Sequence, residues 1–352
     1  MKSISDANKI IYIAPSLSSF VQNDIGFLSK KYNVLLNLYA WNKKYLTPLF
    51  LIHQLFYLLV NIMKVKVVIV SFGGYWSLLP SIIGRLFGVP VFIILNGTDC
   101  ASIPMLHYGN LRSFPLRTFC NYSYKFAYKL LPVSSSLVNT RNKYHSDDKY
   151  SYQGYKHFFP KINTDYQVLF NGIDENFWKP IDNRTRNKKS FITVLSESQF
   201  ILKGGPLILD LASRYNDYEF FFVGLNEPDS FDLPANVTFL GRLDPERLRD
   251  YFLSCQYYMQ LSVYEGFGVA LCEAMLCGCI PIGSSVNIIP EIIGSSGFIL
   301  QKEDIDELVD LVEIALNTED EKFLERMARD RIIENYSLKK REQKLISIIE
   351  QL

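Results

Sequence analysis

Apolar runs and amphipathic stretches alternate along the first half of the chain. Five runs are apolar almost throughout and predict buried strands, at residues 9–14, 34–39, 65–71, 89–95 and 130–136. Helical segments are predicted between them, at residues 20–31, 49–63, 78–87 and 107–129. Strands that are apolar throughout and alternate with helices indicate a parallel sheet covered by helices on both faces.

The same alternation returns in the second half. Strands are predicted at 191–195, 219–224, 237–241, 256–262 and 279–282, and helices at 206–214, 246–254, 269–276, 306–316, 321–334 and 338–352. A crossing strand at 166–170 and a charged linker at 182–189 lie between the halves. Because a chain of 352 residues is longer than a domain with a single hydrophobic core usually is, we expect two α/β domains.

The most apolar predicted helix, residues 49–63, could in principle be a buried helix or a membrane span. It is shorter than the roughly 20 residues of a membrane span. It also contains His53, Gln54 and Asn61, so a buried helix is predicted. The first nine residues are polar and lead directly into a strand, so no signal-peptide core is expected.

One strand, loop and helix carry the chemistry, from Tyr264 to Gly278. Gly266 and Gly268 let a ligand approach the backbone, and the amides of the following helical turn favour an anion such as phosphate. Glu265 and Glu273 are separated along such a ligand and can accept hydroxyl protons, as sugars offer. The alternative is an ordinary strand-to-helix turn with two surface acids.

Glu265, seven residues and then Glu273, with Gly-Phe-Gly after the first Glu, resembles the donor-site signature of family 4 retaining glycosyltransferases. Their fold, GT-B, has two Rossmann-like domains facing each other across a cleft, with a C-terminal helix that crosses back to the first domain. The resemblance implies an acceptor-binding domain at 1–165, a nucleotide-sugar-binding domain at 166–336 and a returning helix at 337–352.

The resemblance also implies roles for single residues. Glu265 and the following backbone would hold the donor sugar, Glu273 the ribose, and Lys203 the pyrophosphate. The Arg that accompanies this Lys in relatives falls near Ser198, and Arg242 is a candidate replacement. The implied donor site is thus Glu265, Lys203, Glu273, Gly266, Phe267, Gly268, Val269, Ser198 and Arg242. Neither a metal ion nor a cofactor besides the donor is implied.

For the acceptor side, polar and glycine residues follow the predicted strands of the first half. They are Ser18 and Ser19, where relatives often carry glycines, then Gly73, Gly74, Asn96 and Asp99. Asn96 stands where many relatives have a His; its amide can bind a hydroxyl but cannot carry a proton. For Asp99 a local turn or capping role is an equal alternative.

Charge is divided unequally along the chain. Residues 1–170 carry a net charge of +12 and residues 171–352 one of −11. A basic half indicates an anionic partner. Arg112, Arg117, Lys125 and Lys129 alternate with aromatic residues, a pattern typical of contact with an anionic membrane surface, although aromatics also serve a core. No nucleic-acid motif accompanies this charge.

Two other patterns have simple explanations. Six scattered cysteines fit neither a disulfide scaffold nor a zinc site, and indicate buried thiols in a reducing compartment. The pair Asp304 and Asp306 resembles a metal motif, but helix capping explains it.

The sequence therefore predicts a retaining transferase that moves a sugar from a UDP- or GDP-sugar to a glycan or lipid-linked acceptor. By resemblance, its setting is the cytoplasmic assembly of a bacterial surface polysaccharide, with a peripheral place at the inner face of the membrane. The alternatives are a nucleotide-sugar epimerase of related fold and a noncatalytic sugar-nucleotide-binding subunit. A glycoside hydrolase is disfavoured, because the two carboxylates would not flank one glycosidic bond.

Overall fold

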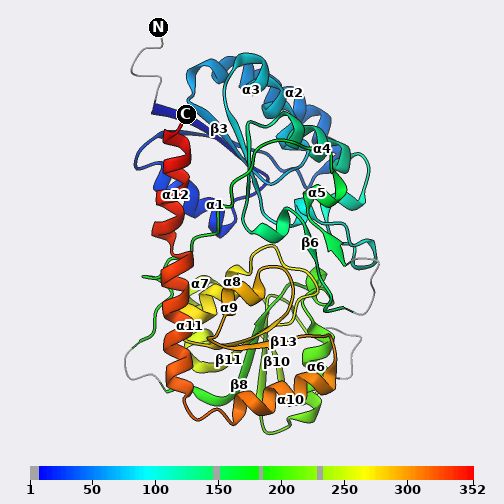
Figure 1. Ribbon diagram of the computed structural model, residues 1–352, viewed down its shortest axis with the longest axis vertical. Coiled ribbons are helices and arrows are strands. Elements are labelled where there is room, and N and C mark those ends of the chain that lie inside the picture. Colours follow the sequence, from blue (N-terminus) through cyan, green and yellow to red (C-terminus); the bar gives the residue numbers. More distant parts are fainter. Residues whose placement is uncertain (1–7, 146–150, 182–184, 228–232) are drawn as a thin grey trace. The chain divides into compact units, whose positions relative to one another are not determined.

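The computed structural model describes all residues except 1–7, 146–150, 182–184 and 228–232 (Figure 1). It divides into two compact units. Unit 1 comprises Met1–Thr140, Tyr152–Gly172 and Leu338–Leu352, and unit 2 comprises Arg141–Ser151 and Ile173–Ser337. Each unit is built on one parallel sheet, as the sequence predicts.

The sheet of unit 1 has the order β2-β1-β3-β4-β5. Its strands are β1 (Lys9–Ala14), β2 (Asn33–Leu38), β3 (Val67–Ser71), β4 (Val91–Leu95) and β5 (Lys129–Pro132). β3 and β4 are buried at every position, because helices cover both faces of the sheet.

The helices of unit 1 are α1 (Ser19–Leu28), α2 (Thr47–Asn61), α3 (Tyr75–Phe87), α4 (Leu116–Phe126), α5 (Tyr155–Phe158) and α12 (Leu338–Glu350). Two short strands, β6 (Thr140–Arg141) and β7 (Tyr152–Gln153), pair with each other. Right-handed crossovers put α1 on one face of the sheet and α2, α3 and α4 on the other. In agreement, α3 contacts both α2 and α4, whereas α1 contacts α12.

A buried ion pair attaches α12 to unit 1. Arg341 Nε and Nη2 donate to the two carboxylate oxygens of Asp24 on α1, at 2.6 and 2.8 Å. Tyr12 on β1 also donates to Asp24, and Arg341 Nη1 donates to the carbonyl of Phe170 at 2.8 Å. Both charged side chains are almost completely buried, at 1% and 0% exposure. A buried charge pair is stable only when its remaining hydrogen bonds are also satisfied, as they are here.

The sheet of unit 2 has the order β10-β9-β8-β11-β12-β13, and all its pairs are parallel. Its strands are β8 (Asn187–Val194), β9 (Glu219–Val223), β10 (Val237–Phe239), β11 (Cys255–Gln260), β12 (Ile280–Ser284) and β13 (Phe298–Leu300). The predicted linker at 182–189 includes residues outside the described part of the chain, and its end forms the start of β8.

The helices of unit 2 are α6 (Gly205–Arg214), α7 (Pro245–Ser254), α8 (Val269–Leu276), α9 (Ile289–Ile293), α10 (Ile305–Leu316) and α11 (Glu321–Tyr336). Asp304 caps α10, because its Oδ1 accepts from the amides of Asp306 and Glu307 at 2.9 and 3.0 Å. The capping explanation of this acidic pair is thereby confirmed.

The predicted strand at 166–170 is wrong. The segment runs along β5 but makes only an isolated bridge, between Tyr166 and Leu130. Leu130 N donates to Asp165 O, and Gln167 and Leu169 donate to the carbonyls of Leu130 and Pro132. The ladder would next require an N–H at Pro132, which proline lacks, so regular pairing stops there.

The domain boundaries differ from the predicted 165/166 division. The change to unit 2 falls after Gly172, and the segment Arg141–Ser151 also belongs to unit 2. Within that segment Tyr144 is 2% exposed, and its carbonyl accepts from the amide of Glu303 at 2.9 Å. The reason is long-range packing, which no local pattern around residue 141 encodes.

The prediction that residues 49–63 form a buried helix is also wrong. Of the residues of α2, Gln54 and Leu58 are buried, while Leu49, Ile52 and Phe56 expose 59%, 55% and 63% of their surface. By length and composition alone, Thr47–Lys64 could also cross a membrane, and 17% of that stretch is buried. A core helix would be mostly buried, so α2 is apolar for another reason.

Candidate functional site

The strand order of unit 2 marks where a ligand would bind. From β8 the chain moves outward to β9 and β10, and it then returns to β11 and moves the other way to β12 and β13. Neighbouring strands β8 and β11 therefore send their following loops in opposite directions. In open parallel sheets ligands bind beyond the strand carboxyl ends at such a switch point.

The loops after these two strands carry Lys203 and Glu265. Lys203 Nζ lies 3.8 Å from Glu265 Oε2, and the two side chains are 17% and 14% exposed. Gly204 has φ +75°, and a Cβ there would lie 2.4 Å from the carbonyl oxygen of Leu261. A glycine is therefore required for the first loop to pass this close to the end of β11. The structure brings together two residues that the sequence separates by 62 positions.

A buried polar chain holds the carboxylate of Glu265. Gln260 Nε2 donates to Glu265 Oε2 at 2.9 Å, and Tyr258 OH donates to Gln260 Oε1 at 2.8 Å. The amide of Gly266 donates to Glu265 Oε1 at 3.1 Å. The sequence interpretation missed Gln260, although a polar residue at the end of a mainly aromatic and apolar strand was an available signal.

The loop after Glu265 leads into α8 as the motif predicts. Gly268 has φ +94°, in the region that favours glycine, and it immediately precedes the helix. Phe267 is 2% exposed and packs edge-on against Tyr336, with ring centroids 5.5 Å apart. The buried ring fixes the loop, and the first-turn amides of α8, which have no intrahelical partners, can face an anion.

Glu273 lies on α8 and is partly buried. Burial raises the pKa of Glu273 to about 8, and the nearby positive charge of Lys203 opposes this rise. Burial, followed by the charges of Glu265 and Glu273, also raises the pKa of Tyr258 well above its usual range. The charges of Glu265 and Glu273 thus both raise the pKa of Tyr258, although within the described residues no hydrogen bond joins the two carboxylates.

Two asparagines, Asn142 and Asn287, are hydrogen-bonded to each other, and one of them also binds the loop that carries Glu265. Asn287 has φ +49°, a conformation that Asn tolerates better than most residues. Its Oδ1 accepts from Glu265 N at 3.3 Å and from Asn142 Nδ2 at 3.0 Å. Asn142 Oδ1 in turn accepts from Asn287 N at 3.1 Å. The sequence interpretation missed Asn142, because it lies 145 residues from its partner.

We expect Asn142→Ala to impair turnover more than nucleotide binding. The change removes two hydrogen bonds to Asn287 and so loosens the backbone that presents Glu265, while leaving Glu273 untouched. The expected loss in kcat is about tenfold, which corresponds to one or two hydrogen bonds. Steady-state kinetics and calorimetry with nucleoside diphosphate would measure the two effects. Asn335→Ala, at an exposed asparagine of α11, is the control; equal losses of turnover and binding in N142A would indicate a merely structural role.

Two predicted phosphate ligands, Ser198 and Arg242, make no hydrogen bond or ion pair with Lys203 or Glu265 among the described residues. Ser198 is exposed, and its hydroxyl lies 3.3 Å from that of Ser196. Arg242 is exposed and follows β10 at the edge of the sheet, two strands from β8. In the described part of the chain, no hydrogen bond or ion pair of Arg242 is found. The cation beside Glu265 is therefore Lys203.

In unit 1, Asp99 organises the loops after β3 and β4. Its carboxylate accepts from the amides of Gly73, Asn96 and Gly97 at 2.8, 3.0 and 2.9 Å. The side chain is completely buried, and burial raises the pKa of Asp99 to about 6, against the lowering effect of these hydrogen bonds. Of the two predicted roles for Asp99, the local turn is the one that these contacts describe.

The other predicted cleft residues of unit 1 surround its own switch point, between β1 and β3. The amide of Gly74 donates to Ser77 Oγ at 2.9 Å, so both glycine amides are used within the unit. A Cβ at Gly73 would lie 2.1 Å from the hydroxyl of Tyr124, which explains the glycine by packing. Ser19 is exposed, whereas Ser18 Oγ and Asn96 Oδ1 are buried and have no hydrogen-bond partner in the described part of the chain.

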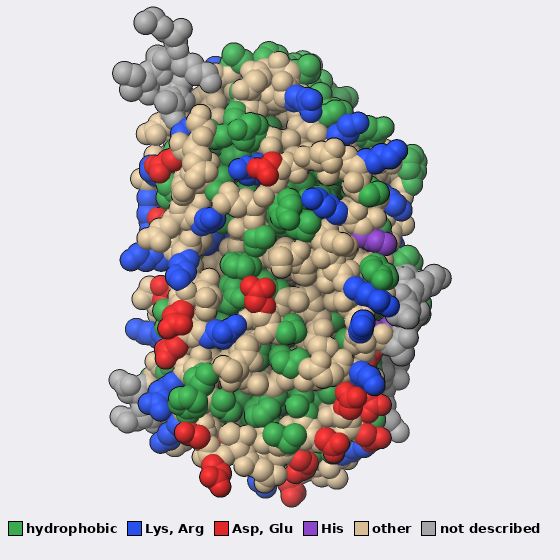
Figure 2. Space-filling model, viewed as in Figure 1, with side chains coloured by type: hydrophobic (Ala, Val, Ile, Leu, Met, Phe, Trp, Pro, Cys, Tyr) green, Lys and Arg blue, Asp and Glu red, His purple; other side chains and the backbone are tan. Residues whose placement is uncertain are grey.

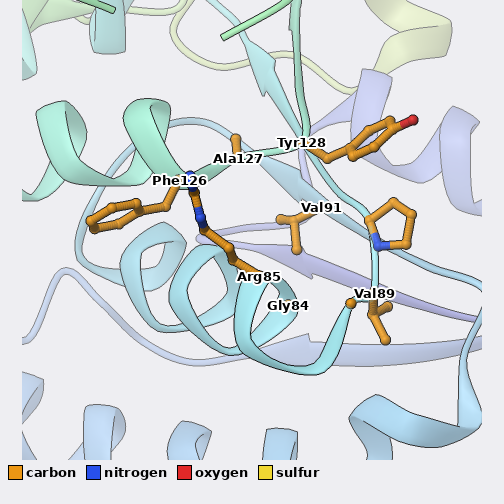
Figure 3. A pocket seen from close by; sticks show the side chains of 9 residues that line it. Gly84, Arg85, Val89, Val91, Phe126, Ala127 and Tyr128 are labelled. Atoms are coloured by element: carbon orange, nitrogen blue, oxygen red, sulfur yellow. The ribbon is translucent and has the colours of Figure 1, made fainter.

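A pocket of about 400 Å³ lies elsewhere in unit 1 (Figure 3). Arg85, Val91, Phe126 and Tyr128 line it, and Arg85 reaches toward Phe126, with the guanidinium 5.7 Å from the ring centre. It opens where β4 begins, so it lies at the opposite sheet edge from the loops that follow the strands. We therefore do not include it in the candidate site.

The described residues contain no group of three or more His, Cys, Asp or Glu side chains able to hold a metal ion. The six cysteines are free and buried, as predicted.

Comparison with known proteins places these features in a family context. Residues 180–335 match the model of glycosyl transferases group 1. The chain is 33% identical over 70 residues to O-antigen chain mannosyltransferase B of Escherichia coli, which covers 20% of this chain and 18% of that protein. It is 26% identical over 219 residues to N-acetyl-alpha-D-glucosaminyl L-malate synthase of Bacillus anthracis, covering 56% of this chain and 55% of that protein.

Solved structures resemble the whole chain. HepE of Anabaena in complex with UDP aligns with a TM-score of 0.74 at 14% identity, over 98% of this chain and 100% of the other. Sucrose-phosphate synthase of Thermosynechococcus elongatus aligns with a TM-score of 0.72 at 12% identity, over 98% of both chains. The chain therefore has the GT-B fold with two Rossmann-like domains, and its second domain carries the sequence pattern of glycosyl transferases group 1.

Proposed function

We propose that this protein is a family 4 retaining glycosyltransferase that moves a hexose from a nucleotide-diphosphate sugar to a glycan or lipid-linked acceptor. The observation that carries the proposal is the Lys203–Glu265 pair, 3.8 Å apart at the switch point of unit 2 and next to the start of α8. A cation, a helix N-terminus and a carboxylate on adjoining loops match the diphosphate and the hydroxyls of one such donor.

Each group has a distinct task in the transfer. When the bond between sugar and diphosphate breaks, negative charge grows on the diphosphate, and Lys203 and the first amides of α8 stabilise it. Glu265, held by Gln260 and Gly266, accepts hydrogen bonds from hydroxyls of the sugar ring. Lys203 and the helix terminus supply the positive charge that the step requires, so we propose a reaction without a metal ion. We assign no residue as a covalent nucleophile.

The donor and its setting follow from similarity to other proteins. Structures of HepE contain UDP and UDP-glucose, which supports a UDP-sugar, and the GDP-sugar remains the second choice. Similarity to an O-antigen mannosyltransferase supports a role in bacterial surface polysaccharide synthesis at the cytoplasmic side of the membrane. Under this proposal the first domain, unit 1, binds the acceptor.

A direct test separates transfer from the two alternatives. The protein is incubated with each of a panel of UDP- and GDP-sugars, with and without glycan acceptors, and the products are followed by NMR. Transfer releases nucleoside diphosphate and gives a product with the anomeric configuration of the donor. A change of sugar stereochemistry without acceptor would show an epimerase, and binding without any turnover across the acceptors would show a noncatalytic subunit.

Glu273 gives a pH-dependent prediction. Ribose hydroxyls donate to an ionised carboxylate, but the pKa of Glu273 in the unliganded protein is raised to about 8, so at neutral pH binding must remove its proton. Affinity for nucleoside diphosphate should therefore increase with pH by roughly tenfold per unit up to about pH 8 and then level off. Binding near neutral pH should release a proton, which calorimetry in buffers of different ionisation enthalpy measures.

Glu273→Gln is the matched variant, because glutamine keeps the size of the side chain but cannot ionise. It should bind nucleoside diphosphate more weakly at high pH, by about 1.5 to 3 kcal/mol. It should also lose the part of the pH dependence that Glu273 causes, while any titration of the diphosphate itself remains. Identical pH profiles of the variant and the natural protein would exclude the ribose assignment.

A further inference from the structure

The outward face of α2 is apolar although it is exposed. Six side chains, spaced three or four residues apart except for one adjacent pair, form a stripe that we name the α2 stripe: Leu49, Ile52, Phe56, Leu59, Val60 and, just after the helix, Met63. Each exposes between 47% and 63% of its surface. A surface helix of a globular protein normally has polar side chains on the face that is exposed to water.

The inward face of the same helix is partly polar. Gln54 is completely buried, and its Nε2 donates to Asn37 Oδ1 at 3.2 Å and to the carbonyl of Trp76 at 3.1 Å. Leu58 packs beside it without exposure. These contacts fix the helix to β2 and α3 and so fix the direction of the stripe. The inward face holds Gln54 and Leu58 and packs Phe50 on Tyr39, so the core does not account for the apolar residues of the outward face.

The charge around the stripe has one sign. Residues 25–98 include seven Lys and Arg residues and not one Asp or Glu. Lys43 and Lys64 are exposed at the two ends of α2. Figure 2 shows hydrophobic and basic side chains, and no acidic ones, over the part of unit 1 where Figure 1 draws α2 and α3. Among the described residues, Lys31 is the one of these seven cations with an ion pair, to Glu350.

We infer that the α2 stripe binds the surface of an anionic lipid bilayer, with α2 lying in the plane of the interface. The stripe from Leu49 to Met63 extends over about 21 Å, at about 1.5 Å per residue. Aliphatic side chains flanked by lysines fit acyl chains below anionic head groups. A protein partner would more commonly meet aromatic residues and arginine, with lysine depleted. Because its back is packed on α3, α2 lies on the bilayer and does not cross it.

This surface differs from the one that the sequence pattern predicts on α4. Arg117 there packs over the rings of Phe158 and Phe159, at 5.7 and 5.8 Å, and Lys129 pairs with Asp165 at 3.3 Å. Two of the four cations that the sequence pattern predicts to face lipid thus have partners inside unit 1. The cations at the ends of α2, in contrast, flank an exposed apolar stripe. Electrostatic attraction to a bilayer would need the cations alone, so the stripe indicates that apolar side chains also enter the lipid.

The test uses flotation of the full chain with vesicles made of equal parts phosphatidylcholine and phosphatidylglycerol. The natural protein should bind these vesicles, and more weakly those of phosphatidylcholine alone. Replacing Ile52 and Phe56 together by serine should lower the partition coefficient roughly tenfold or more, because two apolar side chains leave the interface. Lys43→Gln and Lys64→Gln should each lower it roughly fivefold at low salt.

A matched control is available in unit 2. Ile314 and Phe323 are 60% and 49% exposed, and replacing both by serine should leave vesicle binding unchanged. The circular dichroism spectrum and the unfolding temperature should be the same in all variants, which shows that they are folded. The proposal does not depend on the proposed transferase activity.

Three results would overturn the inference. The natural protein could fail to float with anionic vesicles at low salt. The I52S/F56S variant could bind vesicles as the natural protein does, with Arg112 and Lys125 of α4 and the segment before it carrying the binding instead. Alternatively, this variant could turn an oligomer into a monomer in sedimentation velocity without a change in vesicle binding, in which case the stripe is a contact between copies of this chain.

Discussion

Lys203→Ala should lower kcat by roughly a hundredfold or more while leaving the fold intact. Removing one preorganised group that stabilises developing charge costs about 2 to 4 kcal/mol of transition-state stabilisation. Lys203 lies in a loop, and its Nζ makes two weak contacts, 3.8 Å from Glu265 Oε2 and 3.4 Å from the carbonyl of Val194. The loss should therefore appear in turnover of the sugar nucleotide, measured by release of nucleoside diphosphate, and not in the unfolding temperature.

Two further variants make this result specific. Lys203→Arg keeps the charge and should retain part of the turnover, whereas Lys302→Ala removes an exposed loop cation of the same unit and should have no effect. Full turnover in K203A would make Lys203 an ordinary loop residue. In that case another cation must serve the diphosphate, and Arg242 would be the first to examine.

Arg341→Met should destabilise unit 1 by about 3 to 5 kcal/mol. The change leaves the Asp24 carboxylate buried and without the two donors at 2.6 and 2.8 Å that compensate its charge. Because the two units unfold as separate bodies in the simplest case, the measurement is chemical denaturation followed by probes in each unit. The transition of unit 1 should move to lower denaturant concentration, and that of unit 2 should stay.

The control for this prediction is a second ion pair between α12 and the region of α1. Lys31 on the segment after α1 and Glu350 on α12 also form an ion pair, but both side chains are about half exposed, at 45% and 51%. Exposed pairs contribute little, so Glu350→Gln should leave the transition nearly unchanged. Replacing both Arg341 and Asp24 by apolar residues should recover part of the lost stability, because no buried charge then remains unpaired. If R341M and E350Q behaved alike, the buried pair would have no special role.

Much of the architecture can be predicted from the sequence. The continuous apolar runs predict two parallel sheets because a strand covered on both faces has no polar side. The helix 269–276 is predicted to the residue, since Gly268 and Gly278 delimit it on either side. The pairing of Lys203 with Glu265 is also accessible, because both residues follow strands of a parallel sheet and such loops gather at one edge.

Other features required the tertiary structure, because they depend on partners far along the chain. The segment 166–170 has the composition of a strand, but pairing stops at Pro132, on a strand more than thirty residues earlier. Asn142 looks like a loop residue until Asn287 is placed opposite it. The apolar composition of α2 is compatible both with burial in a protein core and with contact with lipid. The packing of Gln54 against Asn37 shows which face of the helix is inward. Local pattern determines which elements form, whereas long-range contacts decide which face each element presents and what it touches.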